Sequence, residues 1–213
     1  LVINCSFEGS TVTTMGYKFA DNDWSSPLTV NAPDLDSPRT DTIPGTDFPA
    51  VAGFENGFLP AKTYYVHAFA TDGTDEVTGD TLSFTTLAQI QTSTPTPGYT
   101  TVDLAGSVTG ESVPSSGFYW SYQADLTGAT DVPVSPVLGE MTYKLTGLAE
   151  ADTIYVTTYA TNDNGDYAYG DTLKIGTRSC TSPTMDNYTY GTALIFEECW
   201  LSENLRTSVY RDG

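Results

Sequence analysis

Residues 63–72 read Thr-Tyr-Tyr-Val-His-Ala-Phe-Ala-Thr-Asp, and residues 153–162 read Thr-Ile-Tyr-Val-Thr-Thr-Tyr-Ala-Thr-Asn. Each copy is followed by the same Gly-Asp-Thr-Leu, at 79–82 and at 170–173. Within each copy, apolar side chains fall at every second position, which is the period of a half-buried β-strand. A strand pattern that recurs with the same neighbours indicates two copies of one β domain.

The alternation also predicts which side chains face the core. The inward rows are Tyr64, Val66, Ala68 and Ala70 in the first copy and Ile154, Val156, Thr158 and Ala160 in the second. The outward rows are Tyr65, His67 and Phe69, and Tyr155, Thr157 and Tyr159. Two earlier strands match in the same way: Leu1, Ile3, Cys5 and Phe7 with Val102, Leu104, Gly106 and Val108, and Tyr17 and Phe19 with Phe118 and Trp120.

Composition agrees with two small β domains. The chain has 213 residues, including 19 Gly, 12 Pro and 14 Tyr, which is typical of short strands joined by turns. Lys and Arg number 8 against 27 Asp and Glu, giving a net charge of −19. Such a surface repels phosphate backbones and anionic lipid, so nucleic acid is not expected as a partner. No apolar run is long enough to predict a membrane-spanning segment, and no cofactor motif occurs.

The repeated motif, Gly-Phe/Leu-x4-Thr-x-Tyr-Val-x-Ala-Phe/Tyr-Ala-Thr-Asn/Asp followed by Gly-Asp-Thr-Leu-x-Phe/Ile-x-Thr, resembles fibronectin type III-like repeats of Bacteroidota surface proteins. The resemblance covers residues 1–178. It implies an all-β fold with two tandem immunoglobulin-like sandwiches, at 1–88 and 89–178. It also implies a tyrosine corner at Phe58 and Tyr64. The second copy has Ile154 at the corner, so that domain is expected to be less stable or braced differently.

The family resemblance places one more strand before each copy. Ala88–Thr94 can supply it for the second domain, but nothing precedes Leu1 in the first. Either the chain has been trimmed there, or another chain fills the vacant edge by strand addition, which makes neighbouring copies of this protein candidate partners.

Residues 179–213 depart from the repeat. The run Cys-Trp-Leu-Ser-Glu-Asn-Leu-Arg-Thr-x-x-Tyr-x-Asp-Gly, from Cys199 to Gly213, is similar to the opening of the fibrobacter-type major paralogous (FISUMP) domain. The resemblance implies a disulfide between Cys180 and Cys199, which would place the protein outside the cytoplasm. The alternative is two free thiols. Zinc is disfavoured because no His or further Cys stands near them.

Few residues suggest catalysis or metal binding. His67 is the only histidine and is expected on the surface. Cys5, at an inward strand position, is expected to be a buried inert thiol rather than a nucleophile or a lipid anchor. The parts for acyl transfer are missing, so the chain is not expected to be an enzyme. Asn162, Asn164 and Asp166 form a weak calcium candidate, with an ordinary hairpin turn as the alternative.

Two kinds of glycan site are predicted. Thr42, Thr81, Thr153 and Thr172 stand in Asp-Thr-aliphatic triplets that resemble the O-glycosylation acceptor of Bacteroidota, although strand propensity also accounts for some of them. Thr42, in the long loop after the second strand, is the best candidate. Tyr65, Phe69, Tyr155 and Tyr159 are candidates for stacking on sugar rings, with cross-strand pairing as the alternative.

These patterns predict a non-catalytic extracellular surface protein attached to an outer membrane. It would act as a stalk, adhesion or assembly module whose partners are other surface proteins or glycans. One alternative is a spacer in a carbohydrate-active or glycan-binding protein whose active domain lies beyond residue 213. Another is a fibre subunit completed by strand addition.

Overall fold

The computed structural model describes residues 2–6, 12–32, 39–42, 58–135 and 137–206. The regular elements in this part of the chain are β-strands, β1 to β19. The same residues contain no helix long and apolar enough to cross a membrane. The chain divides into two compact units: residues 1–89 with 109–114 and 161–167, and residues 90–108, 115–160 and 168–213. The predicted all-β fold is confirmed.

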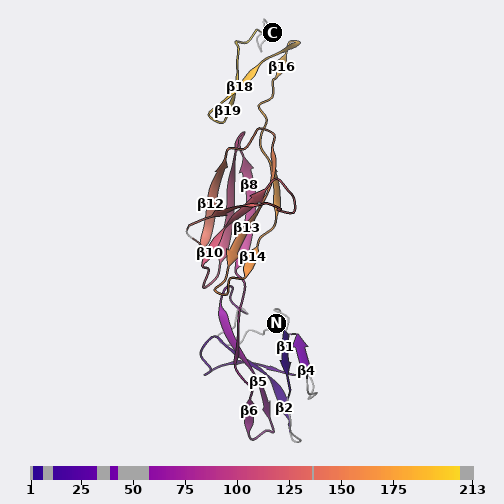
Figure 1. The fold of residues 1–213 in the computed structure, drawn as a ribbon, viewed down its shortest axis with the longest axis vertical. Coiled ribbons are helices and arrows are strands. Elements are labelled where there is room, and N and C mark those ends of the chain that lie inside the picture. The colour runs from indigo at the N-terminus through magenta and orange to yellow at the C-terminus, as the bar shows by residue number, and fades with distance from the viewer. Residues whose placement is uncertain (1, 7–11, 33–38, 43–57, 136, 207–213) are drawn as a thin grey trace, which may run out of the picture. The chain divides into compact units, whose positions relative to one another are not determined.

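The first unit contains two antiparallel sheets (Figure 1). One has the strand order β3-β2-β5-β6, with β7 also paired to β5: β2 is Thr14–Ala20, β3 Leu28–Asn31, β5 Thr63–Thr71, β6 Glu76–Thr78 and β7 Leu82–Thr85. The other pairs β1 (Val2–Cys5) with β4 (Arg39–Thr42). Within the described ranges β1 has β4 as its single partner. Strand addition at its other edge stays a prediction.

Side chains from both sheets form the core of the first unit, which makes it a sandwich. The buried cluster, at most 7% exposed, consists of Ile3, Tyr17, Phe19, Leu28, Tyr64 and Val66. Phe58 lies against it, with its ring 4.6 Å from that of Tyr64 and 5.2 Å from that of Phe84. The inward positions predicted for these strands are therefore confirmed, although Cys5, expected to be buried, and Ala68 are only half-buried. Leu1 and Phe7 lie outside the described residues.

The second unit is a sandwich of a three-stranded and a five-stranded antiparallel sheet (Figure 1). The first sheet has the order β12-β9-β8, with β8 at Gln89–Pro97, β9 at Thr101–Thr109 and β12 at Gly139–Thr146. The other has the order β11-β10-β13-β14, with β15 paired to β13: β10 is Ser115–Ser121, β11 Thr130–Pro133, β13 Thr153–Thr161, β14 Tyr167–Tyr169 and β15 Leu173–Gly176. Strand β8 is the additional strand expected near Ala88–Thr94. This strand order is that of immunoglobulin-like sandwiches.

The core of the second unit follows the predicted rows closely. Val102, Leu104, Val108, Phe118, Ile154, Val156 and Ala160 are at most 1% exposed. The two sheets approach closely at Gly106, where an added Cβ would lie 2.6 Å from the Thr158 hydroxyl. Trp120 was expected in the core but is half-buried. Its ring lies 5.5 Å from the exposed ring of Tyr122, so it sits at the margin of the sheet.

Residues 179–206 form two short hairpins within the second unit. One pairs β16 (Thr184–Met185) with β17 (Tyr188–Thr189), and the other pairs β18 (Thr192–Ile195) with β19 (Glu198–Leu201). The predicted disulfide is confirmed: Cys180 and Cys199 are bonded, with their Cα atoms 5.4 Å apart. A separate domain at 179–213, and the boundaries 1–88 and 89–178, remain predictions.

Candidate functional site

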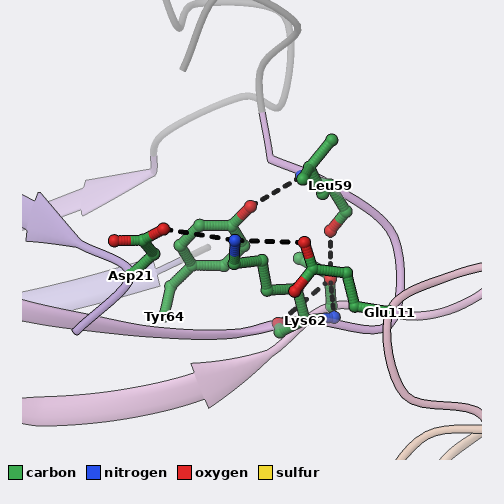
Figure 2. A network of polar contacts seen from close by, with 6 residues as sticks. Asp21, Leu59, Lys62, Tyr64 and Glu111 are labelled. Atoms are coloured by element: carbon green, nitrogen blue, oxygen red, sulfur yellow. Dashed lines mark hydrogen bonds and ion pairs between the residues drawn. The ribbon is translucent and has the colours of Figure 1, made fainter. Parts of the chain in front are cut away.

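The turn before β5 is closed by a tyrosine corner (Figure 2). The Tyr64 ring is buried, and its hydroxyl accepts a hydrogen bond from the backbone N–H of Leu59 at 2.7 Å. The corner predicted from Phe58 and Tyr64 therefore forms. Burial raises the pKa of the Tyr64 hydroxyl above its ordinary value, which keeps it neutral.

A threonine completes each corner, and sequence analysis gave it no role. The Thr86 hydroxyl donates to the carbonyl of Leu59 at 2.6 Å and accepts from the N–H of Lys62 at 3.0 Å. In the second repeat, the Thr177 hydroxyl donates to the carbonyl of Ala149 at 2.8 Å and accepts from the N–H of Asp152, also at 2.8 Å. The sequence marks this residue, because Thr86 and Thr177 end the longer repeated motif Gly-Asp-Thr-Leu-x-Phe/Ile-x-Thr in the two copies.

The second corner uses a carboxylate in place of a phenol. Ile154 occupies the position of Tyr64, and the N–H of Ala149 instead donates to Oδ2 of Asp152 at 3.0 Å. The hydroxyl of Tyr122 donates to the same oxygen at 3.3 Å. Partial burial and then the Asp152 carboxylate raise the pKa of Tyr122. The second domain is thus braced differently, which was one of the two expected outcomes.

Lys62 forms a charged node beside the first corner (Figure 2). Its Nζ lies 3.2 Å from Oδ2 of Asp21, 3.2 Å from Oε1 of Glu111 and 5.7 Å from the centre of the Tyr64 ring. Burial lowers the pKa of Lys62, but hydrogen bonds with Glu111 and Asp21 outweigh burial and raise it. Glu111 is also held through its backbone N–H, which donates to the carbonyl of Pro60 at 3.0 Å. Residues 109–114 are therefore fixed to this corner within the first unit.

The tip of the β18–β19 hairpin is bound by a turn of the second sandwich. The Glu197 carboxylate accepts hydrogen bonds from the N–H of Tyr99 at 2.7 Å and of Thr100 at 3.1 Å. It also accepts from the hydroxyls of Thr100 and Thr101. These bonds, that of the Thr100 hydroxyl foremost, hold the pKa of Glu197 below its ordinary value despite the opposing effect of burial. We call this turn, residues 98–101, the carboxylate cradle.

The cradle depends on a glycine. A Cβ on Gly98 would lie 2.6 Å from Oε2 of Glu197, so any side chain there would displace the carboxylate. The carbonyl of Gly98 accepts from the N–H of Arg178 at 2.7 Å, and the N–H of Cys180 donates to Glu150 at 2.7 Å. The C-terminal hairpins are consequently anchored to the second sandwich at several points.

The outward aromatic rows are not free surfaces. Phe69 and Tyr159 are only 3% and 2% exposed, which corrects the expectation that these outward-facing rings are open on the surface. The ammonium of Lys18 lies 5.0 Å above the Phe69 ring, and the Tyr119 ring stacks on Tyr159 at 4.5 Å. Long side chains of the adjacent strands, β2 and β10, cover both positions. Neither ring offers an open face to a sugar, and Thr157 of the same row is also buried. Tyr65 and Tyr155 are half-buried, and sugar stacking on them stays a prediction.

His67, expected on the surface, is half-buried beneath another side chain. Its ring stacks on the indole of Trp24, with centres 4.2 Å apart and planes 8° from parallel. Burial, followed by the charge of Lys18, lowers the pKa of His67, while Glu76 opposes this shift. Cys5 is half-buried, with its Sγ 3.3 Å from the Tyr17 hydroxyl.

The calcium candidate is a hydrogen-bonded turn. Oδ1 of Asn162 accepts from the N–H of Asn164 at 3.0 Å and of Asp166 at 2.9 Å. Asn162 is 1% exposed, so its amide oxygen is already engaged by the backbone. Within the described ranges no three His, Cys, Asp or Glu side chains are grouped to hold a metal. Calcium binding at this turn remains a prediction. Its first candidate ligand, the amide oxygen of Asn162, already accepts two backbone hydrogen bonds.

The threonines predicted to carry glycans lie in or beside strands. Thr81, Thr153 and Thr172 are exposed. Thr42 was expected in a long loop but ends strand β4, where it pairs with Val2. Residues 21–49 are rich in Asp, Pro and Ser, which are typical of loops, so the sequence did not predict this strand. Modification of the four threonines stays a prediction.

No protein-family model matches the chain, and no curated protein matches it. Among solved structures, the chain is similar to a crystal structure of the FN1-FN3 domains of chicken CNTN1, with 18% sequence identity and a TM-score of 0.34. The match covers 80% of this chain and 58% of that one. The chain thus spans less than two thirds of that structure's length. The sandwich assignment rests on strand order and burial.

Proposed function

We propose that the chain is a non-catalytic extracellular surface protein whose tandem sandwiches serve as a stalk or adhesion module. The anchored C-terminal hairpins carry the proposal. A stalk must hold successive segments in a fixed arrangement. Here the Glu197 carboxylate, the Arg178 N–H and the Cys180 N–H each bond to the second sandwich. Several bonds at separate points restrain a segment far more than one flexible linker does.

The disulfide supports an extracellular location. Bonded cysteines persist in oxidising compartments and are rare in the cytosol. Cys180 and Cys199 close the segment whose tip enters the carboxylate cradle. The bond therefore supports the geometry of the anchored hairpins as well as the compartment.

The reactive groups that catalysis would need have structural partners. The His67 ring lies beneath Trp24, and the Cys5 thiol lies against the Tyr17 hydroxyl. A nucleophile and a base act when they are hydrogen-bonded to one another. Cys5 and His67 line the same cavity, but the Cys5 thiol bonds to Tyr17 and the His67 ring stacks on Trp24. These contacts support a binding or spacing role.

Proteinase K treatment of intact cells tests the location, with a cytosolic protein as the control. We expect the native protein to be digested while the control is protected. Alkylation with iodoacetamide before reduction should label Cys5 at most, and Cys180 and Cys199 only after reduction. Protection from the protease, or free thiols at both Cys180 and Cys199 in freshly isolated protein, would overturn the proposal.

A further inference from the structure

The two repeats carry an equivalent loop between their second and third strands. In the first repeat, Asp23 accepts from the N–H of Ser25 at 2.8 Å. In the second, Asp125 accepts from the N–H of Thr127 at 3.0 Å. Each forms a side-chain turn around one central residue, which is Trp24 in the first repeat and Leu126 in the second. Trp24 and Leu126 therefore hold corresponding places in the two turns, although only Leu126 has a positive φ.

The central residue of this loop faces the outer surface of the sheet. In the first repeat, the Trp24 indole lies flat on His67 at 4.2 Å. In the second, Thr157 stands at the His67 position and the smaller Leu126 replaces the indole. A cavity of about 360 Å³ is present there, lined by Tyr119, Leu126, Ala129, Thr157, Tyr169 and Thr172. The place that holds a flat ring in the first repeat is thus open in the second.

The cavity is lined by apolar groups and hydroxyls, without a charged side chain. Tyr119 is held in place by stacking on Tyr159 at 4.5 Å, and the Tyr169 ring lies 6.3 Å from Tyr119. The Thr157 hydroxyl is buried and donates to the carbonyl of Gly170 at 2.9 Å, whereas Thr172 is exposed at the cavity and can exchange hydrogen bonds with a ligand. Tyrosine rings beside such a hydroxyl complement a ring with apolar C–H faces and equatorial hydroxyls.

The backbone of the loop is left-handed at Leu126, with φ +59°. This conformation also occurs at other turns of the chain, such as Ala61 and Ala151. At Leu126 it accompanies the placement of the side chain at the cavity wall.

We infer that this cavity is a binding site for a neutral pyranose sugar. Its volume lies near the lower end of the roughly 300–1,000 Å³ typical of small-molecule sites, which suits one or two sugar rings. The net charge of −19 disfavours uronic and sialic acids. The assignment rests on the proposed surface role and gives it a ligand class.

Saturation-transfer NMR on the full chain tests the site, with methyl glycosides of glucose, galactose, mannose and N-acetylglucosamine as probes. We expect at least one glycoside to bind with a Kd in the millimolar range, as for other ligands with so few atoms. Glucuronic acid should not bind. Tyr169→Ala should weaken binding at least tenfold, and Leu126→Trp, which copies the first repeat, should abolish it by filling the cavity.

Tyr143→Ala is the matched control, because Tyr143 is an exposed tyrosine on the other sheet of the same sandwich. It should leave the Kd unchanged, and amide spectra of all variants should confirm that they fold. Lack of binding by every glycoside, or binding that persists in both cavity variants, would overturn the sugar site. Displacement of the glycoside by free indole at lower concentration would also overturn it, in favour of an aromatic ligand. None of these results bears on surface location, which the protease and alkylation experiments decide separately.

Discussion

The carboxylate of Asp152 performs in the second repeat the task of the Tyr64 hydroxyl in the first. Tyr64 accepts the N–H of Leu59 at 2.7 Å, and Asp152 accepts the equivalent N–H of Ala149 at 3.0 Å. Both side chains satisfy one backbone donor at the same turn, where an unpaired amide would cost stability. The repeats therefore preserve an interaction while exchanging a buried neutral group for a half-buried anion.

Replacing Tyr64 with Phe should destabilise the first unit by about 1 to 2 kcal/mol, because the Leu59 N–H loses its partner while the ring packing remains. Hydrogen exchange of the β5 amides measures the change. Tyr65→Phe, in the same strand, should have an effect below about 0.5 kcal/mol. Equal losses in the two variants would show that the corner hydrogen bond does not stabilise the fold.

Asp152→Ala should lower the pKa of Tyr122. Partial burial keeps that pKa raised, and the Asp152 charge and hydrogen bond add to the increase. Removing the carboxylate leaves only the effect of burial. A pH titration of the Tyr122 ring carbon by NMR follows the shift, and Tyr143 serves as an internal reference. An unchanged Tyr122 titration would mean that the 3.3 Å contact is not populated in solution.

Attachment of the β18–β19 hairpin should depend on pH. The pKa of Glu197 in the fold lies below its ordinary value of 4.5. The fold therefore favours the ionised carboxylate, and the stabilisation is complete above about pH 4.5. It is lost as the pH falls through the lowered pKa. The protection factors of the amides in residues 192–201, which exclude the intrinsic pH dependence of exchange, should fall over that range.

Glu197→Gln should remove most of this pH dependence and accelerate hairpin exchange at neutral pH, because a neutral amide is a weaker acceptor for the cradle. Glu198→Gln, at the adjacent exposed position, should behave like the native chain. Hairpin protection factors that are independent of pH in the native chain would contradict the assignment.

Removing the disulfide should loosen the same segment. The bonded residues are 19 positions apart, and closing a loop of that size contributes about 3 kcal/mol. A chain with both Cys180→Ser and Cys199→Ser should be cleaved within 179–206 much faster by a dilute protease. Cys5→Ser, which leaves the bond intact, is the control. Equal cleavage rates would show that the cradle alone holds the hairpins.

The charged node at Lys62 should contribute modestly to the free energy of unfolding. Lys62→Met preserves the side-chain stem over Tyr64 but removes the charge, and we expect a loss below about 1 kcal/mol that shrinks at high salt. Lys144→Met removes a more exposed pair with Asp103, whose side chains are 59% and 56% exposed, and should have no measurable effect. Denaturant titrations at low and high salt compare the two. A larger loss for Lys144→Met would contradict the ranking by burial.

The core could be predicted from the sequence because strand periodicity acts locally. Each inward residue is recognisable from its neighbours two positions away, and Ile154 and Val156 are fully buried as expected. The outward row was harder to predict, because its exposure depends on adjacent strands. Tyr119 covers Tyr159 from β10, and nothing within β13 reveals that contact.

The cradle and the cavity could not be predicted for a related reason. Glu197 meets Tyr99 across 98 positions of sequence, and no local pattern marks such a pair. The Trp24 position became informative only through the matching hydrogen bonds of the Asp23 and Asp125 turns. By contrast, Thr86 and Thr177 were visible as repeated residues, and only their role required the coordinates.

The close approach at Gly98 couples two distant positions in evolution. An added carbon at 98 would stand 2.6 Å from the Glu197 carboxylate oxygen and 2.4 Å from the Thr101 hydroxyl, so both side chains would have to move. Descendants of this gene that keep the acid and the threonine should therefore keep the glycine. Glycine at 98 together with an acid at 197 offers a way to recognise homologues that retain the docked hairpin.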